Sequence, residues 1–240
     1  MTDKEYFEAI CKVDSETVHS KEGIGSLSEK RLHRIIKSYL ANDPTCHEVA
    51  VGKYFADVLS EGEIFEIQTK ALSRLLPKLK YYLEETPYSV TVIHPVIRNK
   101  KIIRIDPETG EILRQKISPK HGSSAHALPE IHGLRELLGN DRLQIKLMLI
   151  DAAEYRYSER MRYRREGAYD SELFPTMLAE VETYAYGADF LKFLPSGRQS
   201  FTAAEYSKFI GLTGRKLYSA LYLLCSLGLI RKDGKTYFRN

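Results

Sequence analysis

The sequence has little of what several classes of protein require. Its only three cysteines are Cys11, Cys46 and Cys225, and no two of them form a C-x-x-C pair. A disulfide framework or a structural zinc site is therefore not expected, and a reducing cytoplasm is the predicted location. No run of ~18 apolar residues is present, which argues against a membrane-spanning helix. The first residues mix both charge signs and lack an apolar stretch, so no secretory signal is expected.

Motifs for nucleotide binding and for nucleophilic catalysis are also missing. Neither G-x-G-x-x-G nor G-x-x-x-x-G-K-[S/T] occurs, which argues against dehydrogenases and nucleotide-driven motors. There is no G-x-S-x-G elbow of the kind that hydrolases use. His121, His126 and His132 lie in one loop-like stretch, but their spacing matches no zinc motif.

What the chain does have is the composition of a globular protein with one basic end. Apolar residues make up 43% and charged residues 28% of the 240 residues, enough for one large domain or two smaller ones. The formal net charge is +4. Residues 186–240 carry nine Lys and Arg against three Asp and Glu, so the rest of the chain is close to neutral. Such an end favours a polyanionic partner, with an ordinary solvated surface as the alternative.

The hydrophobic pattern predicts an N-terminal half in which helices flank a group of short strands. Its order is helix, three strands, helix and strand, at 27–41, 47–51, 54–59, 63–69, 71–84 and 89–96. Ser26 and Glu29 form a predicted capping box for the first helix. Pro77 either kinks the second helix or marks its true start.

The pattern beyond residue 100 predicts further strands and then a small helical module. We expect a hairpin over 101–115, a loop over 118–133 that leads into a short helix near 130–138, a strand over 143–157 and a connecting helix or linker over 158–185. Short helices follow over 188–194 and 203–210, and a third begins after Thr213. A hairpin over 229–238 turns at Asp233-Gly234. Two helices joined by a tight turn and followed by a hairpin are typical of a winged helix-turn-helix.

Two carboxylates fall on neighbouring predicted strands. Asp57 lies on the second strand of the group and Glu66 on the third. Because strand side chains alternate, Glu66, Gln68 and Lys70 share one face. Hard oxygen ligands held close together are what a divalent cation needs to assist phosphodiester hydrolysis. Alternatively, these are strand-edge charges that face solvent. Glu29 on the first helix is a further candidate, although a helix cap explains it equally well.

These residues resemble the PD-(D/E)XK nuclease superfamily, the restriction-endonuclease-like fold, over roughly 25–95. That family has an αβββαβ core, an Asp on the second strand and Glu/Asp-x-Lys on the third. The resemblance implies Mg²⁺ (or Mn²⁺) as cofactor, with Asp57, Glu66, the carbonyl of Ile67 and Glu29 as ligands. Gln68 stands in the Lys position, as in Glu-x-Gln variants. The residues left to supply a positive group are Lys70, Lys78 and Lys120.

The sequence therefore predicts an α+β or α/β protein with a restriction-endonuclease-like αβββαβ core and mixed sheet, followed by a small winged-helix domain. The expected domains are 1–157 (nuclease-like), 158–185 (connecting helix or linker) and 186–240 (winged helix-turn-helix). The expected function is metal-dependent hydrolysis of DNA, with Asp57, Glu66, Gln68 and Lys70 as catalytic residues. The alternative is a catalytically inactive DNA-binding or regulatory protein on the same scaffold.

DNA is the expected partner, no membrane is expected, and a homodimer is left open. The predicted DNA-binding residues lie off the apolar stripe of the third helix of the basic end and on its wing: Arg215, Lys216, Ser219, Arg231, Lys232 and Lys235.

Overall fold

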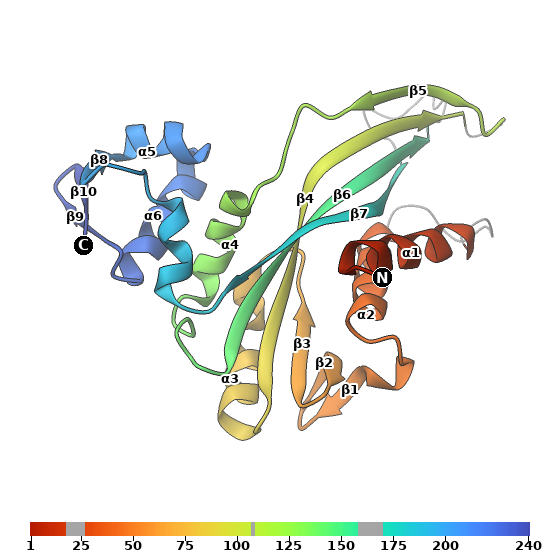
Figure 1. Cartoon of the computed structure of the whole chain (residues 1–240), viewed down its shortest axis with the longest axis horizontal. Coiled ribbons are helices and arrows are strands. Elements are labelled where there is room, and N and C mark those ends of the chain that lie inside the picture. Colours follow the sequence, from red (N-terminus) through yellow and green to blue (C-terminus); the bar gives the residue numbers. More distant parts are fainter. Residues whose placement is uncertain (18–26, 107–108, 158–169) are drawn as a thin grey trace, which may run out of the picture. The chain divides into compact units, whose positions relative to one another are not determined.

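The chain forms an α+β fold, which confirms the coarser of the fold predictions. The structure, a computed structural model, describes residues 1–17, 27–106, 109–157 and 170–240 (Figure 1). Its helices are α1 (Asp3–Thr17), α2 (Leu27–Leu40), α3 (Leu76–Glu85), α4 (Leu128–Ile131), α5 (Ala203–Ile210) and α6 (Gly214–Ser226). Its strands are β1 (His47–Val51), β2 (Tyr54–Ser60), β3 (Glu63–Ile67), β4 (Ser89–Ile105), β5 (Ile112–Ile117), β6 (Leu143–Tyr157), β7 (Asp170–Tyr184), β8 (Ser200–Thr202), β9 (Ile230–Asp233) and β10 (Thr236–Arg239).

Most of the strands belong to one mixed sheet. Its order is β1-β2-β3-β4-β6-β7, and β5 pairs with β4 beside this path. Strands β2 and β3 are antiparallel, whereas β3 and β4 are parallel and are joined by α3. Along the chain, α2, β1, β2, β3, α3 and β4 follow one another in the predicted order of helix, three strands, helix and strand.

The described chain divides into two compact units, each assembled from three segments. The first unit contains residues 1–47, 97–122 and 148–181, and the second contains 48–96, 123–147 and 182–240. The domains predicted from the sequence, 1–157, 158–185 and 186–240, follow a different division and stay a prediction.

In the first unit, α1 and α2 pack through aromatic rings and a buried arginine. The rings of Phe7 and Tyr39 meet edge to face at 5.5 Å. Arg31 is buried, with Nε 3.1 Å from Asp14 Oδ2 and Nη1 3.6 Å from Glu172 Oε2. A buried arginine between two carboxylates is compensated, because each charge has an opposite partner.

In the second unit, the connection from β3 to β4 depends on a proline. A 3-10 turn over Leu72–Leu75 precedes α3, and Pro77 lies in the first turn of that helix. Pro77 therefore marks the start of the helix, one of the two alternatives that the sequence left open, because a proline at this position loses no helical hydrogen bond. Leu79 and Tyr82 of α3 are fully buried, and so is Ile64 of β3.

The C-terminal elements of the second unit follow their sequence signals. Thr202 and Glu205 form a capping box at the start of α5, and Gly211 ends this helix with a φ of 75°. Strands β9 and β10 form the predicted hairpin, and β8 pairs with β10 as a third strand. Residues 187–193 form a 3-10 helix where the sequence predicts a short helix over 188–194. Thr213 precedes α6 but makes no side-chain capping bond.

Several predicted elements are wrong or shifted. The connecting helix or linker expected over 158–185 is instead the strand β7 over Asp170–Tyr184, and residues 158–169 lie outside the described residues. The short helix expected near 130–138 comes earlier, as α4 over Leu128–Ile131 between two 3-10 turns. Strand β3 ends at Ile67, not at residue 69. The predicted Ser26–Glu29 capping box also lies outside the described side chains.

Within the described ranges, no helix is long and apolar enough to cross a membrane.

Candidate functional site

Strands β2 and β3 place Asp57 opposite Glu66. The antiparallel register pairs Val58 with Phe65, and its continuation by one residue pairs Asp57 with Glu66. Directly opposed residues on neighbouring strands point to the same face of the sheet. The Asp57 carboxylate also accepts a hydrogen bond from the backbone N–H of Ile67, with an N···Oδ2 distance of 2.8 Å. The two predicted acids are therefore brought together at the end of β3.

The Glu66 carboxylate is buried, and α3 supplies its partners. Only 1% of Glu66 is exposed. Lys78 Nζ lies 2.6 Å from Glu66 Oε2, and the Tyr82 hydroxyl donates to Oε1 over 3.4 Å. Lys78 and Tyr82 are four residues apart, so they lie on one face of α3. The Lys78 side chain is 20% exposed, so the partner of the buried acid is itself in contact with solvent.

Burial and neighbouring charges raise the pKa values of two groups at this site, Glu66 and Tyr82. Burial raises the pKa of Glu66 to about 7, which outweighs the lowering effect of Lys78, and the Asp57 charge raises it further. Burial also raises the pKa of Tyr82, and the Glu66 charge adds to that effect. A strongly perturbed carboxyl group beside a second acid and a lysine is a feature of functional sites.

Gln68 is held by its backbone at the end of the strand. Its N–H donates to the carbonyl of Ile93 over 2.9 Å, and its carbonyl accepts from Nδ1 of His94 over 2.7 Å. A carbonyl oxygen can only accept, so Nδ1 of His94 carries the proton. Burial lowers the pKa of His94, which favours the neutral imidazole. The Gln68 side-chain amide donates to the carbonyl of Lys70 over 2.5 Å.

Other predicted site residues are not brought to the carboxylates. Within the described part of the chain, the side chains of Gln68 and Lys70 make no hydrogen bond or ion pair with Asp57 or Glu66. Lys70 is exposed. Glu29 lies in the first turn of α2, and its side chain lies outside the described residues.

The sequence missed Tyr82 and His94 and named Lys78 only among alternatives. Lys78 and Tyr82 border the apolar stripe of α3 at a spacing of four, a signal that was available. His94 lies in a near-continuous apolar strand, where a buried polar residue needs a partner.

The predicted DNA-binding residues lie on α6, on β9 and in the turn that follows β9. All are exposed except Ser219, which is half-buried: Arg215, Lys216, Ser219, Arg231, Lys232 and Lys235. The Arg231 guanidinium lies 4.8 Å from the centre of the Phe238 ring. This region therefore presents cations to solvent.

No group of three or more His, Cys, Asp or Glu side chains is arranged to hold a metal ion among the residues that the structure describes. A cation bound at the end of β3 would therefore take two carboxylates from this chain and backbone oxygen besides.

Comparisons with known proteins identify relatives without giving an activity. No solved structure matches the chain. A protein of Treponema pallidum (strain Nichols), named only "Uncharacterized protein", is 32% identical over 162 residues, which cover 65% of this chain and 63% of the relative. The match thus spans less than two thirds of that relative's length. A family described as a domain of unknown function, DUF8091, matches residues 30–185, most of the chain and the whole of the site around Glu66, so the chain belongs to the DUF8091 family.

Proposed function

We propose that the protein is a metal-dependent nuclease that hydrolyses phosphodiester bonds in DNA, on a restriction-endonuclease-like core with a C-terminal winged helix. The observation that carries the proposal is the pairing of Asp57 with Glu66 on adjacent strands beside Lys78. The order α2-β1-β2-β3-α3-β4 supports it, because it agrees with the αβββαβ order of PD-(D/E)XK nucleases. The two-helix and hairpin arrangement of α5, α6, β9 and β10 supports the winged helix.

The donors at the site fit a divalent cation. Asp57 and Glu66 offer carboxylate oxygens, and Ile67, whose N–H is bound by Asp57, offers a backbone carbonyl at the strand end. These are the hard ligands that Mg²⁺ and Mn²⁺ prefer. The raised pKa of Glu66 means that Lys78 compensates its ionised form only in part, and a cation would supply further compensation.

The chain's own side chains have separate roles in the proposed reaction. When bound, a divalent cation would supply Lewis-acid activation of the phosphodiester. Asp57 and Glu66 would hold it, and the Tyr82 hydroxyl would keep one oxygen of Glu66 in place. Lys78 would donate to a phosphate oxygen and stabilise the negative charge that develops there. In this proposal Lys78 takes the role that the family gives to the lysine at the position of Gln68.

The test is cleavage of supercoiled plasmid and branched DNA in the presence of Mg²⁺ or Mn²⁺. The wild type should cut, and Asp57→Asn and Glu66→Gln should abolish cutting. Glu61→Gln is the matched control, because Glu61 is an exposed acid in the turn between β2 and β3. A wild type that cuts nothing with either metal, or acidic variants that cut like the control, would rule the proposal out.

A second candidate is a catalytically inactive DNA-binding protein on the same scaffold. The observation that favours it is Gln68, whose amide is bound to the backbone of Lys70. This candidate predicts salt-sensitive DNA binding without hydrolysis under any metal. Titration of Mg²⁺ by calorimetry separates the two, since heat that disappears in Glu66→Gln favours the enzyme.

A further inference from the structure

Two large aromatic side chains lie on the solvent side of α6. Tyr218 is 56% exposed and Tyr222 is 69% exposed. Arg215, which is also exposed, precedes them at a spacing of three residues, and the two tyrosines are four residues apart. Side chains at these spacings share one face of a helix, called here the α6 face (Arg215, Tyr218 and Tyr222). The buried side of the helix is apolar: Leu217, Ala220, Leu221, Leu223 and Leu224.

The stretch of sequence that contains the α6 face is cationic. Residues 214–232 carry four Lys and Arg and no Asp or Glu. Arg215 and Lys216 lie on α6, Arg231 and Lys232 lie on β9, and all four are exposed. Within the described ranges, neither Arg215 nor Lys216 forms an ion pair. The surface around the two tyrosines therefore favours an anionic ligand.

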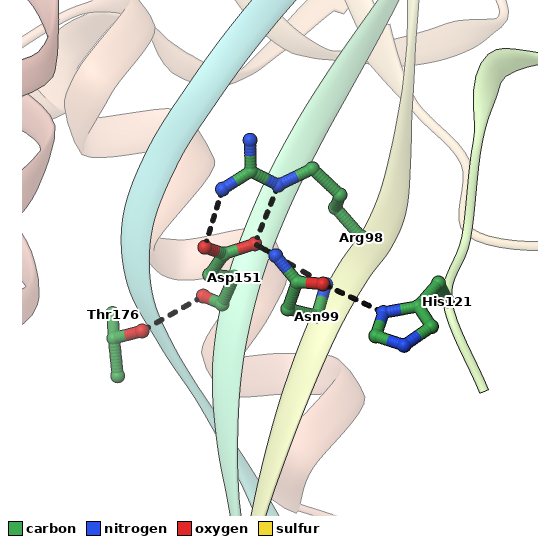
Figure 2. Close-up of polar contacts among 5 residues, drawn as sticks. All are labelled: Arg98, Asn99, His121, Asp151 and Thr176. Carbon is green, nitrogen blue, oxygen red and sulfur yellow. Dashed lines mark hydrogen bonds and ion pairs between the residues drawn. The ribbon is translucent and has the colours of Figure 1, made fainter. Parts of the chain in front are cut away.

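The arginine Arg98 provides a contrast, because its charge is used inside the protein. It belongs to the polar cluster around Asp151 (Figure 2). The Asp151 carboxylate accepts two hydrogen bonds from Arg98, at 2.9 and 2.7 Å, and one from the Asn99 amide at 3.0 Å. In the part of the chain that the structure describes, Arg215 has no such carboxylate partner, so its charge is available to a ligand.

The Tyr222 ring is oriented by a second ring. His132, in the same compact unit, meets it edge to face, with ring centres 5.9 Å apart and an angle of 81° between the planes. Arg135, which is exposed, donates from Nη1 to the His132 carbonyl over 3.1 Å. A further cation therefore lies beside the residue that orients Tyr222. A ring that is already oriented loses less conformational entropy when it binds a ligand.

The spacing of the two tyrosines suits unpaired bases. Four residues of α-helix separate Tyr218 from Tyr222 by about 6 Å along the helix axis, whereas the stacked bases of a duplex are about 3.4 Å apart. In a duplex each base is also covered on both faces by its neighbours, so a protein ring can stack only on a base that is unstacked. Aromatic rings beside cations are the arrangement with which proteins bind single-stranded nucleic acids.

We infer that the α6 face binds single-stranded DNA, with Tyr218 and Tyr222 stacked on bases and Arg215 bound to a phosphate. The inference deepens the proposed function, on which the choice of DNA rests, because it names the form of DNA that α6 holds. A duplex would contact the cations but leave both rings without a base to stack on. A second copy of this chain is a poorer fit, because a symmetric contact would bring the Arg215 side chains of both copies to one interface.

The experiment measures binding of fluorescein-labelled oligonucleotides to the full chain by anisotropy, in EDTA so that nothing is cleaved. The probes are a strand of about 12 thymidines, an abasic strand of the same length and a duplex of the same length. The wild type should bind the thymidine strand more tightly than the other two, because only this strand offers phosphates together with unpaired bases.

The variants separate stacking from charge. Tyr218→Ala and Tyr222→Ala should each weaken binding of the thymidine strand on the order of 5- to 100-fold and leave binding of the abasic strand unchanged. Neither substitution removes a charge, so the slope of log K against log salt should keep its wild-type value. Tyr222→Phe keeps the ring and should bind like the wild type. Tyr186→Ala is the matched control, because Tyr186 is a 50% exposed tyrosine that lies outside the α6 face.

Four results would overturn the inference: no binding of the thymidine strand by the wild type, equal binding of the abasic strand, Tyr218 and Tyr222 variants that bind like the control, or loss of self-association in Tyr222→Ala with unchanged affinity for DNA. The last result would assign the α6 face to a second copy of the chain.

Plasmid cleavage assays keep this outcome separate from the proposed function. Tyrosine-dependent binding of the single strand without cleavage would reject the nuclease and keep the α6 face. Cleavage that depends on Glu66, together with single-strand binding that is unchanged in both tyrosine variants, would keep the nuclease and reject the α6 face.

Discussion

At the scale of single residues, Glu66 combines burial with two charged neighbours. Its carboxylate is 1% exposed and lies 2.6 Å from the Lys78 ammonium. A buried acid with a single cationic partner gains only partial compensation, and here Asp57 opposes it further. The charge arrangement at this site therefore lowers the free energy of unfolding, and a purely structural ion pair would not need it.

The first prediction concerns the pH dependence of stability in the metal-free protein. The pKa of Glu66 rises from 4.5 to about 7 on folding, so between these pH values the folded chain holds a proton that the unfolded chain has lost. The contribution of Glu66 to the free energy of unfolding should therefore fall as pH rises through this window, by at most about 1.4 kcal/mol per pH unit. Urea unfolding across this range measures it.

The Glu66→Gln variant provides the control for this prediction. Glutamine is neutral at every pH, so the contribution should vanish and the variant should be less pH-dependent than the wild type. An identical pH profile in both proteins would show that Glu66 keeps an ordinary pKa.

The second prediction separates Lys78 from Lys70 as the source of the positive group. If Lys78 stabilises charge on the phosphate, Lys78→Met should lower kcat on the order of 10²–10³-fold, whereas Lys70→Met should leave it near the wild-type value. Single-turnover cleavage assays measure the effect. The reverse ranking would return the catalytic role to Lys70.

The sequence predicted the pairing of the two acids but not their partners. The placement of Asp57 and Glu66 on neighbouring strands follows from the alternation of strand side chains and from short turns, which are local properties. The contact with Lys78 depends on where α3 starts and how it lies on the sheet, and Pro77 left two alternatives for that start. The sequence placed Gln68 inside the third strand of the group, whereas β3 ends at Ile67, the residue before it.

At the scale of elements, the turn between β1 and β2 is fitted to α3. Gly52 has a φ of 59°, and a Cβ at this position would collide with the Tyr81 hydroxyl. The Tyr81 ring is itself packed against Tyr54 and Tyr82, with centres 5.4 and 6.2 Å away. This packing connects the hairpin to the helix that carries Lys78.

The third prediction tests this fit with two alanine substitutions. Gly62→Ala, at a φ of 81° with open space around it, should cost only the backbone strain of about 1–2 kcal/mol. Gly52→Ala should cost about 1 kcal/mol or more beyond that, because Tyr81 must move. Chemical denaturation gives both values, and equal losses would mean that Tyr81 yields freely.

Strand β7 shows where element prediction from sequence failed. Glu, Leu, Met and Ala, which favour a helix in isolation, make up seven of the fourteen residues 171–184. Pairing with β6 decides their conformation instead, and such pairing is non-local. By contrast, α5 was predicted with its ends, because its capping box and Gly211 act within a few residues.

At the scale of the whole molecule, the excess positive charge is unevenly distributed. The basic end places Arg215 and Lys216 on the exposed side of α6, and strand β5 adds the exposed cations Arg114 and Lys116. The sequence revealed the first of these through a simple count. The second was hidden, because the exposure of Arg114 and Lys116 depends on the position of β5 beside β4 in the sheet.

The fourth prediction concerns the C-terminal region. Arg215→Ala and Lys216→Ala should each weaken DNA binding and lower the salt slope by about one, as loss of a phosphate contact does. Lys4→Ala removes another exposed cation, on α1, and should change neither quantity. Anisotropy titrations at several salt concentrations measure the affinity and its salt slope. DNA binding that is unchanged in the Arg215 and Lys216 variants would reject a DNA-binding role for α6.

The fold class was predictable from element order, whereas the pairing of distant strands was not. The order of elements from α2 to β4 can be predicted from local periodicity and turn residues. The hairpin predicted over 101–115 is also local, and it is found as the pairing of the end of β4 with β5. The extension of β4 to 17 residues depends on contacts that no single segment encodes.

The most direct test of the account is the anomalous signal from a crystal soaked in Mn²⁺. We expect one strong peak within coordination distance of the Asp57 and Glu66 carboxylates, and its loss in a Glu66→Gln crystal soaked in the same way. A wild-type crystal with no peak at these two side chains, or with a peak that survives the substitution, would contradict the claim that they share a cation.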